Sequence, residues 1–270
     1  MTIIRPLNGL IGAVSVFIGA LLTHTPLNPV QVLFACLVCF FIISAGNVLN
    51  DYADIEIDKI NKPKTLIASG KLKPNQALGI SIILFIIGLV LSIELSSPMF
   101  LVALSTSLLL FLYNFNLKKA GISGNLLVAF LGGLPFVYGG VLQNNWTATI
   151  PPFLFAFLLH LARELLKDIQ DINGDKVGNA VSFPIKYGIK PSIRLTVSIL
   201  IILILFTPIP FLLNLYGFAY LITVILFIDI PIIFLIYKVL KNNSFVPTAC
   251  NILKFNMLIG LVVLALGYYK

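Results

Sequence analysis

The sequence predicts an all-α, polytopic membrane protein in which nine transmembrane helices form one bundle. Hydrophobic residues make up 59% of the chain and charged residues only 10%, a composition typical of membrane proteins rather than soluble domains. Apolar stretches recur at lengths of about 17 to 25 residues, which are sufficient to cross a bilayer. Many of them are rich in Ile, Val and Phe, but only a helix satisfies its own backbone hydrogen bonds within lipid. We therefore expect a helical bundle that forms a single domain over residues 1–270.

Nine apolar stretches meet the length criterion, and short polar segments separate them. The predicted spans are residues 7–23, 29–49, 76–95, 98–115, 122–142, 150–166, 192–213, 216–239 and 248–268. Arg5-Pro6 leads into the first stretch without a small-residue cleavage site, so we expect a helix there and not a signal peptide. The two long connections, 51–74 and 168–191, hold enough polar residues for cytoplasmic loops that cap one end of the bundle.

The basic residues predict the orientation. Lys and Arg gather in the connections on one side, starting with Arg5, whereas the opposite loops at 23–29, 93–98, 143–151 and 207–216 hold none. The positive-inside rule therefore places the N-terminus and both long connections in the cytoplasm. The net charge of +8 is explained by this topology, by anionic lipid headgroups of the lipid bilayer and by an anionic substrate. It does not predict nucleic-acid binding, and no obligatory protein partner is expected.

Two acidic clusters stand out because they repeat one spacing. Each reads D-x2-D-x3-D-K, and the two are 117 positions apart. With Glu56 and Glu164, the two clusters contain eight of the ten acidic residues of the chain. Carboxylates are costly at a membrane, so their concentration indicates a function. The aspartates are Asp51, Asp54 and Asp58 in the first cluster and Asp168, Asp171 and Asp175 in the second.

Helical periodicity places each cluster on one stripe, since each residue advances about 100° around the helix. If the second span continues past the membrane, its stripe consists of Asn47, Asn50, Asp51, Asp54 and Asp58. The stripe of the sixth span consists of His160, Glu164, Lys167, Asp171 and Asp175, with Asp168 at its margin. Two such stripes that face each other would form an acidic pocket at the cytoplasmic membrane edge.

An acidic pocket of this kind predicts a site where Mg²⁺ bridges aspartates to a diphosphate, because Mg²⁺ prefers oxygen ligands and commonly binds substrate phosphates. A single D-x2-D at a helix end is usually a solvated cap, but two matched clusters on one membrane side favour metal binding. Calcium-hand and phosphate-loop motifs are absent from the sequence. Lysines near the clusters would neutralise phosphate oxygens. They are Lys59, Lys64, Lys118, Lys119 and Lys176.

Other polar and small residues favour structural interpretations. Cys36 and Cys39 form a C-x2-C inside an apolar span, where we expect a packed pair and not a metal or redox site. His24 lies in a loop on the opposite side and is not expected to act in the site. Gly132-Gly133, Pro135 and Gly139-Gly140 in the fifth span predict a kink or close helix packing, and packing is favoured.

Four segments resemble the UbiA superfamily of intramembrane prenyltransferases. They are Arg5-Pro6-x-Asn8, Asn50-Asp51-x2-Asp54-x3-Asp58, Tyr113-Asn114 with Lys118, and Arg163-Glu164-x2-Lys167-Asp168-x2-Asp171-x3-Asp175. Segments 50–63, 124–129 and 184–188 are similar to an archaeal group that forms the second ether bond of membrane lipids. One departure is that Lys64-Thr65 follows Pro63, where the family commonly has an Arg-Pro pair.

The resemblance implies that geranylgeranyl diphosphate binds through Mg²⁺ to both clusters in a capped active site, and that geranylgeranylglyceryl phosphate is the acceptor. Asp54 and Asp171 would be catalytic, Tyr113 would face the allylic cation, and Lys118 would stabilise the leaving diphosphate. Further substrate contacts would come from Asn8, Asn47, Asn50, Arg163, Glu164 and Lys167, together with the lysines named above.

Two alternatives stay open at the level of sequence. One is prenylation of an aromatic quinone precursor or a tetrapyrrole by the same chemistry. The other is a cation-coupled transporter that uses intramembrane carboxylates. The acids gather on one membrane side and do not form a path across, which favours the enzyme.

Overall fold

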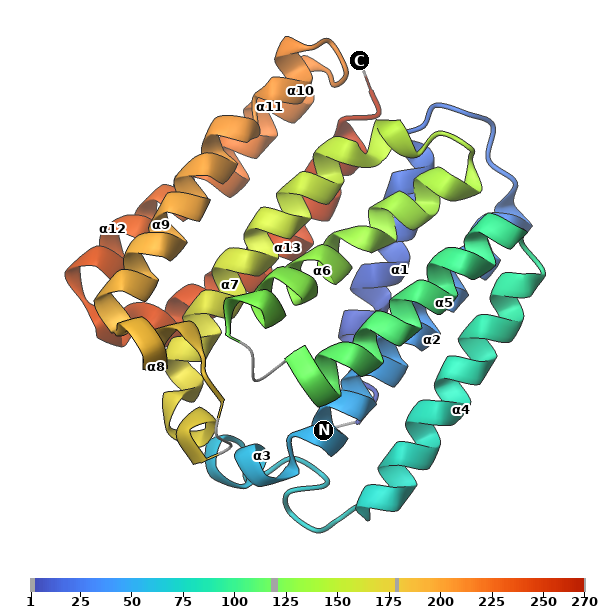
Figure 1. The fold of residues 1–270 in the computed structure, drawn as a ribbon. Coiled ribbons are helices and arrows are strands. Elements are labelled where there is room, and N and C mark those ends of the chain that lie inside the picture. The colour runs from blue at the N-terminus through green and yellow to red at the C-terminus, as the bar shows by residue number, and fades with distance from the viewer. Residues whose placement is uncertain (1–2, 118–120, 178–179, 270) are drawn as a thin grey trace.

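The chain folds into a bundle of long, tilted helices, and a computed structural model describes residues 3–117, 121–177 and 180–269 (Figure 1). No strand occurs in these ranges. The α-helices are α1 Pro6–Leu21, α2 Pro29–Ala53, α3 Ile55–Asn61, α4 Pro74–Ile93, α5 Ser97–Leu112, α6 Ile122–Leu142, α7 Ile150–Val177, α8 Phe183–Tyr187, α9 Ile189–Phe206, α10 Ile209–Leu212, α11 Phe218–Val224, α12 Ile230–Lys241 and α13 Val246–Leu266. Short π-helical or 3-10 segments are η1 Tyr113–Leu117, η2 Trp146–Thr149, η3 Ile225–Asp229 and η4 Asn243–Phe245.

The predicted membrane spans correspond closely to these helices. In the described part of the chain, eight helical segments are long and apolar enough to cross a membrane. They confirm the second to ninth predicted spans. The first, α1, has 16 residues and rises only about 24 Å, which is less than a typical hydrocarbon core of about 30 Å. Its first turn and the end of α13 lie at opposite ends of the bundle (Figure 1).

Helix boundaries differ from the prediction at both acidic clusters. α2 ends at Ala53, and Asp54, with φ −95° and ψ 9°, forms a joint before the short α3. The continuous stripe predicted for the first cluster is therefore wrong. α7, in contrast, continues 11 residues beyond the predicted end at 166 and carries the whole second cluster on one helix.

The glycines of α6 allow close contact with its neighbours, as predicted. An ideal Cβ at Gly139 would lie 2.1 Å from the carbonyl oxygen of Val16 in α1. A Cβ at Gly133 would lie 2.6 Å from the ring of Phe153 in α7. α6 is thus held directly against both helices. Cys36 and Cys39 are free cysteines: Cys39 is buried in an apolar core and Cys36 packs against it, as expected for a packed pair.

Two apolar cores position the ends of α2 and α7. One is formed by α2 with α4 and α5, and includes Val38, Phe85 and Met99. The other is formed by α7 with α9 and α11–α13, and includes Leu165 and Leu253. Because α2 and α7 belong to different cores, their acidic ends are held on two sides of a gap. α3 crosses from the end of α2 to pack on α7.

Candidate active site

A polar pocket lies where α2 gives way to α3, next to the final turns of α7. Six carboxylates line it, and two lysines, Lys62 and Lys167, are interspersed among them. The carboxylates are Asp54, Asp58, Glu164, Asp168, Asp171 and Asp175. The structure therefore brings the two acidic clusters together, as the sequence predicted.

The α7 side of the pocket is organised by pairs of charges. Glu164 is 6% exposed and contacts two cations: its Oε1 accepts from Arg163 at 3.1 Å and its Oε2 from Lys167 at 3.2 Å. Asp168, one turn further along, accepts a hydrogen bond from Asn125 Nδ2 at 2.8 Å. Burial of a carboxylate requires such partners. Glu164 is thus held by neighbouring cations, whereas Asp168 is oriented by a neutral amide.

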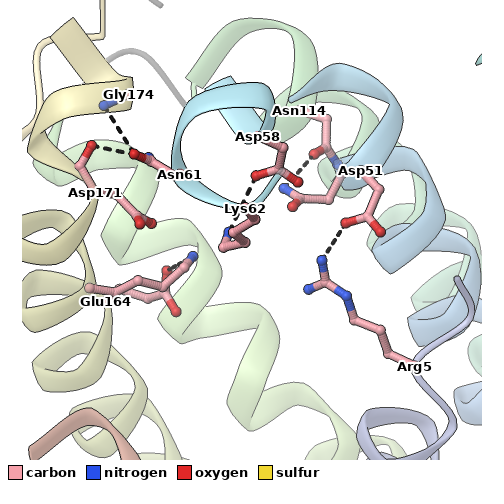
Figure 2. A network of polar contacts seen from close by, with 11 residues as sticks. Arg5, Asp51, Asp58, Asn61, Lys62, Asn114, Glu164, Asp171 and Gly174 are labelled. Carbon is pink, nitrogen blue, oxygen red and sulfur yellow. Dashed lines mark hydrogen bonds and ion pairs between the residues drawn. The ribbon is translucent and has the colours of Figure 1, made fainter. Parts of the chain in front are cut away.

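The α3 side carries Asp58, which is 2% exposed and lies 3.4 Å from the Nζ of Lys62 one turn later (Figure 2). Asp54, at the joint, is 6% exposed and also lines the pocket. Asp51 has a different environment. Its carboxylate accepts from the guanidinium of Arg5, and it is not among the residues that line the pocket (Figure 2).

Another part of the pocket wall is formed by η1. This π-helical turn places two successive side chains, Tyr113 and Asn114, on the pocket surface. Wide turns of this type are frequent at functional sites. Asn114 Oδ1 accepts from Asn50 Nδ2 at 3.0 Å, so Asn50 supports the wall. Asn8 and Asn47 contact each other at 3.4 Å outside the lining.

Several predicted phosphate contacts lie away from this surface. Lys59 is exposed and pairs with Glu56 at 2.7 Å, and Lys64 and Lys176 are exposed outside the lining. Arg163 donates to Glu164 and is not among the lining residues. Lys118 and Lys119 fall outside the described residues, so their predicted roles stay predictions.

The pocket also contains residues that the sequence interpretation missed as site residues. Lys62 follows Asp58 by four positions, and this spacing could have indicated the contact. Asn114 was noted only as part of a motif. Asn125 belongs to segment 124–129, which was noted only for its resemblance, and Ser182 lies in a loop that no local pattern marks.

The donor set suits Mg²⁺. Every carboxylate in the lining offers hard oxygen ligands, and none of the described lining residues is Cys or His. Within the described ranges, no three His, Cys, Asp or Glu side chains are grouped closely enough to hold an ion by themselves. Mg²⁺ commonly takes only one or two carboxylates and completes its shell with water and substrate phosphates. Residues able to provide those ligands are Asp54, Asp58, Asp168, Asp171 and Asp175.

The fold is that of a polytopic helical membrane protein with an acidic pocket at one end of its bundle. The chain belongs to the UbiA prenyltransferase family, whose model matches residues 12–267. It is therefore an enzyme that transfers prenyl groups.

The chain is also similar to individual relatives and solved structures. The chain is 36% identical over 267 residues to digeranylgeranylglyceryl phosphate synthase of Methanosphaera stadtmanae, covering 98% of this chain and 97% of that protein. A solved structure of a digeranylgeranylglyceryl phosphate synthase is 34% identical, with a TM-score of 0.78 and coverage of 98% and 96%. A UbiA homologue from Archaeoglobus fulgidus bound to GPP and Mg²⁺ shares the fold, with a TM-score of 0.67 at 14% identity and coverage of 97% and 98%.

Proposed function

We propose that this protein transfers a geranylgeranyl group from geranylgeranyl diphosphate to the free hydroxyl of geranylgeranylglyceryl phosphate, with Mg²⁺ as the cofactor. The observation that carries the proposal is a pocket whose lining combines five aspartates from both clusters with Lys62 and Lys167. The full-length similarity to digeranylgeranylglyceryl phosphate synthase supports the choice of substrates.

The donor diphosphate binds between α3 and α7. Bound Mg²⁺ would supply the positive charge that lets aspartates hold a diphosphate and that stabilises its departure. Asp54 and Asp58 would hold it from one side, and Asp168, Asp171 and Asp175 from the other. The Nζ groups of Lys62 and Lys167 donate hydrogen bonds to phosphate oxygens. That a homologue of the same fold was solved with GPP and Mg²⁺ bound is consistent with a prenyl diphosphate and a metal as ligands.

The reaction breaks the allylic C–O bond of the donor and forms an ether C–O bond with the acceptor. The diphosphate leaves with the bonding electrons, and the acceptor hydroxyl oxygen attacks the allylic carbon. Its proton passes to the diphosphate or to an aspartate of the pocket. Tyr113 presents an aromatic face to the positive charge that develops on the prenyl group. The apolar helices below hold the two prenyl tails.

The pocket faces the cytoplasm in this proposal. The connections at its end of the bundle carry almost all the Lys and Arg residues, whereas the opposite loops carry none apart from the last residue. A cytoplasmic site gives access to a soluble diphosphate headgroup while the prenyl chain stays in the bilayer.

The experiment supplies purified protein with Mg²⁺, geranylgeranyl diphosphate and one acceptor at a time. We expect ether formation with geranylgeranylglyceryl phosphate and little reaction with 4-hydroxybenzoate or a naphthoate. Efficient prenylation of an aromatic ring, with none of the glycerol phosphate, would contradict the acceptor assignment. Cation uptake into vesicles without consumption of prenyl diphosphate would instead support the transporter alternative.

A further inference from the structure

The side chain of Asn61 links the two halves of the pocket. It lies at the end of α3, and its amide makes two hydrogen bonds to the backbone of α7 (Figure 2). Nδ2 donates to the carbonyl oxygen of Asp171 at 3.2 Å, and Oδ1 accepts from the N–H of Gly174 at 3.1 Å. An amide is suited to this contact because it offers one donor and one acceptor side by side.

Gly174 makes the contact possible. An ideal Cβ at this position would lie 2.3 Å from Nδ2 of Asn61 and 2.7 Å from its Oδ1. Glycine inside a helix costs about 1 kcal/mol relative to alanine. Here the missing side chain leaves the space that the Asn61 amide occupies. Gly174 and Asn61 therefore form a matched pair on facing segments.

The residues around this contact are those that line the pocket. Asp58 precedes Asn61 on α3 and Lys62 follows it at the helix end, and Asp171 and Asp175 flank Gly174 on α7. Asn61 and Gly174 themselves are not part of the lining. The contact thus fixes the distance between two sets of charged groups without occupying the space between them.

α3 depends on such a contact for its position. It has only seven residues, and an isolated helix of this length is unstable in water. The joint at Asp54 separates it from the long helix α2. Carboxylates on opposite sides of a gap also repel each other, which favours separation of α3 from α7 in the absence of cations.

We propose that Asn61 is a positioning residue: its paired hydrogen bonds to α7 hold the carboxylates of α3 at the separation that a magnesium–diphosphate complex requires. The proposal rests on the proposed function, because it assigns the contact to the same site. Residues that orient ligands without binding the ion typically change affinity or activity by about 10- to 100-fold when replaced.

The experiment compares Asn61→Ala, Gly174→Ala and the double variant with the wild-type protein. Gly174→Ala disrupts the contact from the other side while it raises the helix propensity of α7. Gly79→Ala is the matched control, since a Cβ at Gly79 would meet no atom within 4 Å. The readouts are calorimetric binding of pyrophosphate with Mg²⁺, KM and kcat for geranylgeranyl diphosphate, and thermal unfolding in detergent.

We expect each single variant to raise the pyrophosphate Kd and the donor KM by about tenfold, with a smaller change in kcat. The double variant should have the same Kd and KM as Asn61→Ala, because the amide that a Gly174→Ala side chain would displace is already absent. Gly79→Ala should match the wild type. Unchanged Kd and KM in both single variants would refute the positioning role. It would also be refuted if the changes in Kd and KM of the two single variants added up in the double variant and accompanied a lower unfolding temperature. If the wild-type protein transfers no prenyl group, the proposed function fails, and the pyrophosphate titrations still decide the role of Asn61.

Discussion

The guanidinium of Arg5 donates to the carboxylate of Asp51, and this ion pair connects the start of α1 to the last turn of α2. The Asp51 side chain is 8% exposed and that of Arg5 is 38% exposed. The backbone of Arg5 has φ 43° and ψ 66°, a left-handed conformation that is uncommon for a residue other than glycine. Asp51 is thus paired with Arg5, whereas Asp54, about one turn later, lines the pocket.

This difference in environment predicts unequal effects of removing charge from the aspartates. Asp54→Asn and Asp171→Asn should each lower kcat by about a hundredfold or more, because both carboxylates line the pocket. Asp51→Asn should lower kcat much less and should mainly reduce thermal stability, since it weakens the pair with Arg5. Prenyl transfer and unfolding temperature, measured on the three purified variants, check the prediction. Equal losses of kcat would place Asp51 among the metal ligands, as its sequence pattern predicts.

Removal of divalent metal should abolish prenyl transfer. Among the described residues, the pocket is lined by six carboxylates and two lysines, so this acidic lining would repel a diphosphate without added positive charge. We expect activity to disappear in excess EDTA and to return when Mg²⁺ is added beyond the chelator. Ca²⁺ should restore less, because its longer bonds and larger shell do not match the same ligands. Full activity in EDTA would contradict a metal-dependent site.

Lys62 and Lys59 form a matched pair for testing donor binding. Lys62 lines the pocket beside Asp58, whereas Lys59 makes an exposed pair with Glu56. Lys62→Gln should raise the KM for geranylgeranyl diphosphate by about tenfold, since a hydrogen bond to a charged group contributes about 1.5–3 kcal/mol. Lys59→Gln should leave it unchanged, because exposed pairs contribute about 1 kcal/mol or less. A larger increase in KM for Lys59→Gln than for Lys62→Gln would mean that the donor binds the face of α3 that carries Lys59.

The sequence predicted the acidic pocket because helical spacing determines which side chains share one face of a continuous helix. On α7 the stripe of Glu164, Lys167, Asp171 and Asp175 follows directly from the rotation of about 100° per residue. For the first cluster the same reasoning failed at Asp54, where the chain changes direction. Local spacing does not reveal such a joint, since the choice between a continuous and a broken helix depends on what α3 packs against.

Sequence periodicity did not predict the contacts between segments that are distant in the chain. Asn125 reaches Asp168 across 43 positions, and Asn61 reaches Gly174 across 113. Each depends on how α6 or α3 is packed against α7. The sequence did predict close packing by the glycines of α6, because small residues within a membrane span allow neighbouring helix backbones to approach closely. It did not specify which helix they would meet.

The aromatic ring of Tyr113 should contribute more to turnover than its hydroxyl group. The residue lies on η1 and lines the pocket, where its ring can stabilise positive charge on the prenyl group. Tyr113→Phe keeps this face and should retain kcat to within a few-fold. Tyr113→Ala should lower kcat by about tenfold or more, since such contacts contribute up to about 2 kcal/mol when desolvated. Single-turnover rates at saturating donor give the comparison. A loss as large in the Phe variant would assign the main role to the hydroxyl.

Close contact between α1 and α6 should make Gly139 intolerant of any side chain. A Cβ there would lie 2.1 Å from the Val16 carbonyl oxygen and 2.6 Å from the Ala20 nitrogen, both of them backbone atoms of α1. Gly139→Ala must therefore move one helix relative to the other, at a cost of about 1–3 kcal/mol. Gly79→Ala provides the control, because the space beside Gly79 is open. We expect a lower unfolding temperature in detergent for Gly139→Ala alone. Equal unfolding temperatures for the two variants would show that α1 can shift away from α6 without loss of stability.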